Sequence, residues 1–352
     1  MSPILVDVLR GDHVESRHRG AIAIVDADGA VVAATGDIER AVFARSAVKA
    51  LQALPLVASG AADRLGLTAI ELALACASHR GEPVHAATAL SMLGKAGLDE
   101  DCLECGAHWP HDETAARDLA AQGREPGALH NNCSGKHAGF LCLACTLAPR
   151  GADLRRFVQG YVDPQHAVMR EVTAALAAAT GADLDSAPRG IDGCSIPAFA
   201  LPLRALALGF ARFATGSGLS SDHALAARRL RTAVAEAPFM VSGTGRMDTL
   251  VMGKLGERVF MKVGAEGMYC AALPSRGLGV AIKIDDGNNA RAAEVAIAAV
   301  IEAALALAGD DAALLRGYSD GVLRNWRGIE VGALRASDAL RESLARALSP
   351  LE

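Results

Sequence analysis

The stretch VFMKVGAEGMYCAAL, residues 259–273, is the clearest guide to the fold of this chain. Two apolar runs, 259–263 and 268–273, flank the glycine-bounded turn 264–267, which is typical of strands. A third apolar run, 278–284, follows soon after. The start of the chain has the same character, because strands are expected at 4–9, 21–25 and 31–34, the last two joined by the hairpin turn Asp26–Gly29. Strands are therefore predicted at both ends of the sequence.

The sequence between these ends predicts helices, and an Ala-rich helix, 289–307, follows the last strand. The central helices are expected at 46–57, 68–75, 83–96, 114–121, 134–147, 164–179, 201–213 and 221–236. The economical fold is α+β, with one antiparallel sheet from the N- and C-terminal segments, covered by terminal helices, and an inserted helical lobe. We expect a single domain, with the sheet lobe at about 1–45 plus 240–352 and the helical lobe at about 46–239.

Composition narrows the class of protein. The 352 residues are 51% hydrophobic but only 4% aromatic, so Ala, Leu and Val must fill the core. The net charge of −5 is scattered and leaves no basic tract, so we expect no nucleic-acid partner. The first ten residues lack the apolar run of a signal peptide, and the apolar segment 295–309 is interrupted by Glu302. We expect a soluble cytoplasmic protein with no membrane partner, in which the 8 cysteines form no disulfides.

The first candidate for chemistry is Arg45-Ser46-Ala47-Val48-Lys49, at the start of a predicted helix. Positions i and i+3 share a helix face, so the Ser46 hydroxyl and the Lys49 amine are expected to meet. A lysine acts as base for a serine when desolvation or a nearby cation lowers its pKa. The alternative is a purely structural role, with a helix-capping serine beside an exposed lysine.

Two further segments strengthen the interpretation. Lys262-Val263-Gly264 ends a late strand, and Gly264 lets a substrate approach the backbone of an edge strand closely. A K-x-G on a late strand, together with S-x-x-K on an early helix, is the pattern of penicillin-recognising serine enzymes. Ser78, in Cys76-Ala77-Ser78-His79, ends an apolar helix and projects into a cleft; a plain helix-ending turn is the alternative.

The cysteines suggest a metal. Cys133 and Lys136 straddle the start of a helix, and Cys194 lies in a tight loop, so two thiolates and a nitrogen are available for Zn²⁺. On chemistry alone His137 is the more expected nitrogen ligand, and a buried thiol beside an anion-binding lysine is the alternative. The pair Cys142/Cys145 is assigned to core packing. The pair Cys102/Cys105, with His108 and His111 nearby, stays open as a minor metal site.

These segments, in this order along nearly the whole chain, resemble the zinc-containing class 3 (rhizobial-type) L-asparaginases. The motifs that carry the likeness are His18-Arg19-Gly20, Arg45–Lys49, Cys76–His79, His130–His137, Asp192-Gly193-Cys194 and Lys262–Gly267. The resemblance implies a serine β-lactamase-like fold, as also used by glutaminases, and hydrolysis of L-asparagine to L-aspartate and ammonia by a homodimer. It also implies two Ser/Lys pairs, Ser46 with Lys49 and Ser78 with Lys262, and Zn²⁺ held by Cys133, Lys136 and Cys194.

The mechanism expected from this resemblance is an acyl-enzyme in which Ser46 attacks the side-chain amide, Lys49 accepts its proton, and Ser78 with Lys262 relays a proton to ammonia. The N–H groups of Ser46 and of the Gly264 turn are expected to form the oxyanion hole. Arg45, His137, Asp192 and Gly264 are the expected substrate-binding positions. Three alternatives remain open: a β-lactam-binding or peptidase-like enzyme, a glutaminase or other small-amide hydrolase, and a zinc-stabilised amino-acid-binding protein.

Overall fold

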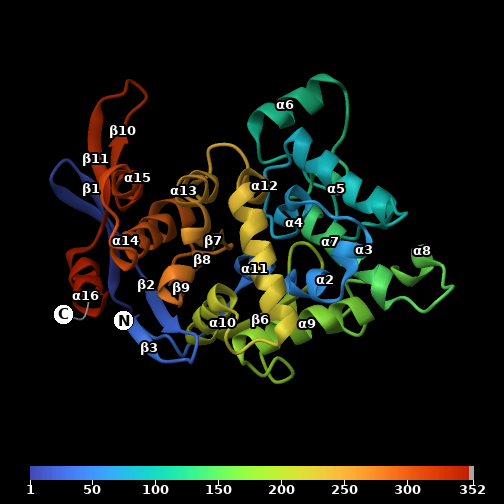
Figure 1. Cartoon of the computed structure of the whole chain (residues 1–352). Coiled ribbons are helices and arrows are strands. Elements are labelled where there is room, and N and C mark those ends of the chain that lie inside the picture. Colours follow the sequence, from blue (N-terminus) through green and yellow to red (C-terminus); the bar gives the residue numbers. More distant parts are fainter. Residues whose placement is uncertain (349–352) are drawn as a thin grey trace. The chain divides into compact units, whose positions relative to one another are not determined.

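The computed structural model describes residues 1–348, and these form two compact units. Unit 1 consists of Met1–Ala47, Ala200–Thr215 and the described residues from Met261 onward, and unit 2 of Val48–Phe199 and Gly216–Phe260. The structure is mixed in class, with strands concentrated in unit 1 and helices in unit 2 (Figure 1).

Unit 1 is built around an eight-stranded sheet in the order β10-β11-β1-β2-β9-β8-β7, with β3 paired to β2. N- and C-terminal strands lie side by side, since β1 pairs antiparallel with β11 and Val6 lies opposite Ala336. The expected sheet from both chain ends is therefore confirmed, and the Asp26–Gly29 turn joins β2 to β3 as expected. The strand bounds are β1 Ile4–Arg10, β2 His13–Asp26, β3 Val31–Thr35, β7 Phe260–Val263, β8 Met268–Leu273, β9 Leu278–Ile284, β10 Asp320–Arg324 and β11 Glu330–Ala336.

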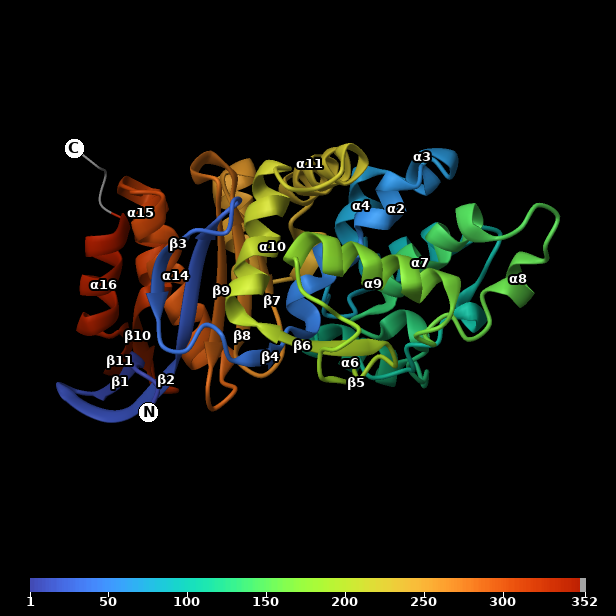
Figure 2. The ribbon, with the colours of Figure 1, turned by 90° about the horizontal axis from the view of Figure 1, so that it is seen from below.

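Helices cover both faces of this sheet within unit 1. Helix α10 packs on β9, β2 and β8, whereas α14 and α15 lie on the opposite side with α16 (Figure 2). Gly279 on β9 is required there, because a Cβ would lie 2.0 Å from the Ala207 carbonyl oxygen of α10. The bounds are α10 Leu203–Thr215, α14 Glu294–Ala304, α15 Gly309–Ser319 and α16 Asp338–Leu348, with a π-helical turn, η6 Asn289–Ala293, before α14.

Unit 2 is helical, and most of its long helix α7 is buried. Every residue from Ser134 to Ala144 of α7 is buried, and the helix packs against α4, α5 and α9. The helices of the unit are α1 Lys49–Gln52, α2 Leu54–Ala58, α3 Ala61–Arg64, α4 Ala69–Ala75, α5 Pro83–Lys95, α6 Glu113–Ala121, α7 Ser134–Leu147, α8 Leu154–Phe157, α9 Ala167–Thr180, α11 Ser221–Glu236, α12 Phe239–Ser242 and α13 Met247–Leu255. The 3-10 turns η2 Glu100–Cys102, η3 Ala128–His130 and η4 Gly256–Arg258 also belong to unit 2, whereas η5 Pro274–Arg276 belongs to unit 1 and η1 Arg45–Val48 begins in unit 1 and ends in unit 2.

Several sequence-based boundaries differ from the structure. The helix expected at 201–213 begins at Leu203 and belongs to the sheet unit, because its apolar face packs on β9 and β2. Residues 240–260, assigned to the sheet lobe, form α12 and α13 of unit 2, which pack on α4 and α11. The helix expected at 46–57 divides into η1, α1 and α2, and Pro55, which has no N–H to donate, stands in the first turn of α2.

A short strand, β6 (Pro197–Pro202), was not expected and continues from one unit into the other. Its first three residues pair with β5 (Arg189–Ile191) in unit 2, and its last three pair with β4 (Ala41–Phe43) in unit 1. No helix within residues 1–348 is both long enough and apolar enough to cross a bilayer.

Candidate functional site

Lys49 is the centre of a buried polar cluster in unit 2. It is the first residue of α1, and the residue is only 1% exposed. Its Nζ donates to the Ala77 carbonyl oxygen at 2.6 Å and to Ser78 Oγ at 2.8 Å, and it lies 3.1 Å from Cys133 Sγ. These three polar partners satisfy the buried amine, because a buried polar group without partners would be costly. The structure thus joins Lys49, Ser78 and Cys133, which come from three separate sequence motifs.

The segments that carry Ser78 and Cys133 are fixed through their backbones. The Ser78 N–H donates to the Val241 carbonyl at 2.9 Å, just beyond the end of α4. The Cys133 N–H donates to Asn131 Oδ1 at 2.8 Å, immediately before α7 begins. The side chains around Lys49 Nζ are therefore positioned by main-chain hydrogen bonds as well as by packing.

His79 ties these two segments together, although the sequence alone indicated only a helix-ending role for it. The His79 N–H donates to the Asn132 carbonyl at 3.2 Å. Its ring Nδ1 accepts from the Gly81 N–H at 3.1 Å, so Nε2 carries the proton and donates to Ser134 Oγ at 2.9 Å. Burial, and then the nearby His85 and Lys49, lower the pKa of His79 well below its usual range, so the ring is neutral. Its place beside Ser78 in the Cys76–His79 motif was the signal that pointed to it.

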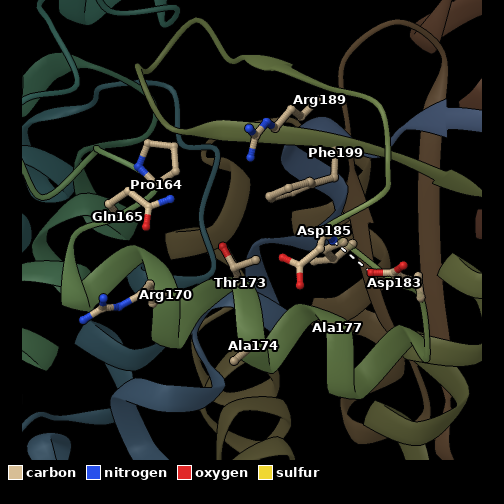
Figure 3. Close-up of a pocket in the computed structure, with 12 residues that line it drawn as sticks. Pro164, Gln165, Arg170, Thr173, Ala174, Ala177, Asp183, Asp185, Arg189 and Phe199 are labelled. Atoms are coloured by element: carbon tan, nitrogen blue, oxygen red, sulfur yellow. Dashed lines mark hydrogen bonds between the residues drawn. The ribbon is translucent and has the colours of Figure 1, made fainter.

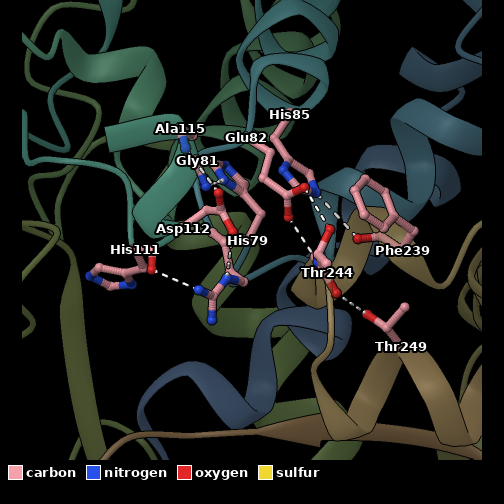
Figure 4. A network of polar contacts seen from close by, with 12 residues as sticks. His79, Gly81, Glu82, His85, His111, Asp112, Ala115, Phe239, Thr244 and Thr249 are labelled. Atoms are coloured by element: carbon pink, nitrogen blue, oxygen red, sulfur yellow. Dashed lines mark hydrogen bonds and ion pairs between the residues drawn. The ribbon is translucent and has the colours of Figure 1, made fainter. Parts of the chain in front are cut away.

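The His79 ring is held from its other face by an aromatic stack. His85 lies 4.9 Å from it with nearly parallel planes, and Phe239 lies 5.0 Å beyond His85. Figure 4 shows this stack beside Glu82, whose carboxylate accepts from the Thr244 N–H and hydroxyl, each at 2.8 Å. The stack fixes the ring that links Ser78 to α7.

Cys133, Cys194 and Lys136 form the second half of the cluster. Lys136 Nζ lies 3.0 Å from Cys194 Sγ, and all three residues are buried. The hydrogen bond from Cys194, together with the ammonium groups of Lys49 and Lys136, holds the pKa of Cys133 well below its usual range, against the effect of burial. That hydrogen bond and burial raise the pKa of Cys194. Burial opposes the charge on Lys136, but the two sulfurs outweigh it and raise its pKa. These opposite pKa shifts favour a thiolate at Cys133 and a thiol at Cys194.

Cys194 reaches this cluster from the tip of the β5–β6 hairpin. The tip is a tight turn, in which the Asp192 N–H donates to the Ile196 carbonyl at 2.9 Å and Ser195 adopts a left-handed φ of 75°. Asp192 stands two residues before Cys194, and its Oδ1 accepts from the Gly193 N–H at 2.7 Å. Its negative charge acts on Lys136, since it contributes to the raised pKa of that residue.

His137 is fully buried in α7, next to Lys136 in sequence. Its Nδ1 lies 2.6 Å from the hydroxyl of Tyr161, and Nε2 has no hydrogen-bond partner among the described residues. Burial, and then Lys136 and Lys49, lower the pKa of His137 well below its usual range. Tyr161, which the sequence did not single out, also accepts from the Glu104 N–H at 3.0 Å. The ring is therefore a neutral group with one buried nitrogen available.

The remaining predicted site residues belong to unit 1. Ser46 lies in η1 behind Arg45, which has a left-handed φ of 50°, an uncommon conformation for a residue with a side chain. Lys262 is fully buried on β7, the edge strand of the sheet, and its Nζ donates to the Val263 carbonyl at 2.8 Å. A Cβ on Gly264 would lie 3.1 Å from the Ala44 carbonyl oxygen and 3.3 Å from Ala47 Cβ. The K-x-G turn therefore packs against the segment that carries Ser46.

The donors Cys133, Lys136 and Cys194 fit a zinc ion. Two sulfurs and one amine nitrogen converge in a buried cluster, and three protein ligands leave a fourth position open, as in catalytic zinc sites. Zinc requires the lysine to be neutral, so binding must release the Lys136 proton as well as a thiol proton.

The other cysteines hold no comparable arrangement. Within residues 1–348, no three His, Cys, Asp or Glu side chains are placed to hold a metal, so the minor site left open at Cys102 and Cys105 is not formed. Cys105 Sγ lies 3.7 Å from the Ala128 carbonyl oxygen, and the rings of His108 and His111 stack on one another. Cys142 is fully buried in α7, which agrees with a packing role.

A surface pocket of about 380 Å³ lies elsewhere in unit 2, between α9 and the segments that flank β5 (Figure 3). Charges of both signs line it, including Arg170, Arg189, Asp183 and Asp185. None of the site residues predicted from the sequence lines this pocket.

The chain was compared with protein families, curated proteins and solved structures. A solved structure titled "Crystal Structure Analysis of Mglu" matches 78% of this chain and 64% of its own, with 16% identity and a TM-score of 0.33. The chain thus spans a little under two thirds of that protein's length. No curated protein matches the chain. The model of the family described as L-asparaginase II matches residues 6–336. Because this match covers nearly the whole sequence, the chain belongs to the L-asparaginase II family.

Proposed function

We propose that this protein is an L-asparagine amidohydrolase of the zinc-containing class 3 subtype, with a serine β-lactamase-like fold and a cytoplasmic location. Membership of the L-asparaginase II family supports hydrolysis of a small amide. The observation that carries the proposal is the 2.8 Å contact of Lys49 Nζ with Ser78 Oγ inside a buried cluster. A buried amine in contact with a hydroxyl is the arrangement by which a lysine activates a serine.

The proposed reaction has two stages. A serine Oγ bonds to the side-chain carbonyl carbon of asparagine as its proton passes to Lys49; the C–N bond then breaks, and the nitrogen leaves as ammonia with a transferred proton. Water next cleaves the ester, which releases aspartate and restores the serine. Ser46 is the proposed nucleophile and Ser78 with Lys262 the proposed proton relay. The Gly264 turn is proposed to supply N–H donors to the oxyanion and Arg45 to hold the substrate carboxylate.

The contact of Lys49 with Ser78 gives a second candidate nucleophile, and one experiment separates the two serines. Ammonia release from L-asparagine and L-glutamine is measured for the wild type, Ser46→Ala and Ser78→Ala, and the acylated peptide is identified by mass spectrometry after acid quench. With Ser46 as nucleophile, Ser46→Ala loses turnover and the adduct, whereas Ser78→Ala still forms the adduct slowly. An adduct on Ser78 would reverse the two roles, and ligand binding without ammonia release would favour an amino-acid-binding protein. Faster release from glutamine would favour a glutaminase.

The proposed zinc site comprises Cys133, Lys136 and Cys194, with His137 and Asp192 in support. A bound zinc ion would supply a positive charge for orienting the amino and carboxylate groups of the substrate. We expect Cys133→Ser and Cys194→Ser to lose metal and to raise KM more than they lower kcat. Cys102→Ser, outside the cluster, is the control and keeps both metal content and KM. An unchanged KM in metal-free protein would refute substrate orientation by zinc.

We further propose that the protein works as a homodimer, and the family resemblance supports this proposal.

A further inference from the structure

β10 forms one edge of the large sheet in unit 1, and it is a regular strand on which α15 packs. β10 begins the strand order, so among residues 1–348 only β11 pairs with it (Figure 1). The bulge in this pairing lies on β11, where Val331 is skipped between Gly332 and Glu330, so β10 itself stays regular. The edge lacks Pro and Lys, two of the residues with which natural proteins protect exposed edges. Such a strand is available for pairing with another chain.

Register places an alternating row of charges across four strands up to this edge. Cross-strand partners share one face, so the row runs Arg17 on β2, Asp7 on β1, Arg335 on β11 and Asp320 on β10. Arg17 Nε lies 3.0 Å from Asp7 Oδ1, and Arg335 Nε lies 2.7 Å from Asp320 Oδ1. The row ends at the edge on a negative charge, Asp320, whose side chain is 45% exposed.

An apolar row runs beside the charges on the same face. It consists of Val14, Leu9, Ala333 and Val322, again one residue from each strand. Val322 is 48% exposed at the edge, and the turn after β10 carries the fully exposed Trp326. Exposed aromatic and aliphatic side chains beside an open strand edge are typical of protein interfaces.

We propose that β10 pairs antiparallel with β10 of a second copy of this chain, about a two-fold axis at Val322. Counting outward from that residue, the axis sets Asp320 opposite Arg324 of the partner subunit, and Arg324 opposite the partner subunit's Asp320. The charge row then continues without a break in alternation, and the two apolar rows meet at Val322. An edge of five residues alone falls short of the roughly 1,200 Å² of a specific interface, so Trp326 and its turn must add contact area.

This surface deepens the proposed homodimer but does not depend on the amide chemistry, because none of its residues belongs to the proposed site. The test is the mass of the full chain by light scattering after size exclusion, with ammonia release measured on the same samples. Asp320→Arg places two Arg–Arg contacts across the axis, and Arg324→Asp places two Asp–Asp contacts there. Glu15→Arg is the matched control, because it makes the same charge change on β2, which β1 and β11 separate from β10.

The wild type and Glu15→Arg are expected at twice the 36.2 kDa of one chain. Each of the other variants is expected to dissociate about tenfold to a hundredfold more readily. Mixing the two restores both Asp–Arg contacts in a heterodimer, so the mixture returns to dimer mass, which also shows that both variants are folded. A monomeric wild type, or a dimer that neither variant weakens, would overturn the proposal. A wild type that is dimeric but releases no ammonia would count against the proposed function and not against this interface.

Discussion

Gly135 shows how closely the cluster depends on helix packing, and its replacement by alanine is a sharp test. Gly135 lies in the first turn of α7, between Cys133 and Lys136, and faces the end of α4. A Cβ at this position would lie 2.4 Å from Leu74 Cγ and 2.5 Å from the Leu74 carbonyl oxygen. The leucine side chain can rotate, but the carbonyl belongs to the backbone of a packed helix and cannot.

The expected magnitude follows from two opposing effects. Alanine favours the helix over glycine by roughly 0.5–1 kcal/mol. Favourable carbon contacts lie at about 3.5–4.0 Å, so the new methyl group overlaps its neighbours by about 1 Å, and overpacking of this kind costs about 1–3 kcal/mol. The larger effect is steric, so Gly135→Ala should lower the free energy of unfolding by about 1–2 kcal/mol. Because α7 must move away from α4, Cys133 shifts relative to Ser78, and ammonia release should fall as well.

The assay is urea unfolding followed by circular dichroism, with Gly94→Ala as the matched control. Gly94 lies in α5 and is exposed, and a Cβ added there would have no described atom within 4 Å. This control should therefore be neutral or slightly stabilising, with unchanged ammonia release. If Gly135→Ala unfolded at the same urea concentration as the control, the inferred close packing of α7 on α4 would be wrong.

Two further predictions concern buried polar groups in unit 2. Burial opposes ionisation of Glu71, but hydrogen bonds from Lys95, Thr68 and Ser91 outweigh it and hold its pKa below the usual 4.5. Because the folded pKa is the lower one, the carboxylate stabilises the fold fully above about pH 4.5, and this contribution disappears as pH falls through the folded value. Glu71→Gln should therefore be less stable than wild type at pH 7 by about 1–3 kcal/mol, and the difference should shrink in acid. Urea unfolding at several pH values measures this difference. A difference that grows in acid would mean that the pKa of Glu71 is raised on folding and not lowered. Ser134→Ala removes the acceptor of His79 Nε2, and thermal unfolding should report a loss of about 1–3 kcal/mol; an unchanged transition would mean that His79 has another partner.

The large elements of the fold were predictable because their signals are local. The apolar runs at 268–273 and 278–284 became strands β8 and β9 with the expected bounds, and Ser221–Glu236 became α11. The strands β10 and β11 were not predicted, since Asp320, Arg324 and Glu330 interrupt their apolar pattern on the exposed face. A helix was predicted at 201–213, close to α10 at 203–215, but its packing on the sheet depends on Gly279, some seventy residues later, and no local pattern contains that contact.

The candidate site was predictable in its residue types and not in its contacts. The motifs supplied Lys49, Ser78 and Cys133, yet no spacing rule states that Lys49 Nζ reaches Ser78 Oγ, because Lys49 begins α1 whereas Ser78 follows the end of α4. The role of His79 was missed although the Cys76–His79 motif contains it, because its contact with Ser134 joins segments distant in sequence. Tyr161 was missed because a lone tyrosine has no distinctive pattern, and its role comes from burial and from its contact with His137.

The pairing of β1 with β11 has a consequence for synthesis of the chain. Val6 and Ala336 are neighbours in the sheet but lie 330 positions apart in the sequence. At about 5–20 residues per second, a ribosome needs on the order of tens of seconds to make the second partner after the first. During that time β1 has no β11 to pair with, whereas the continuous segment Val48–Phe199 of unit 2 has already been made. A nascent chain therefore exposes an open apolar strand through most of its elongation, and slower translation lengthens the period in which that strand is open to a chaperone or to another nascent chain.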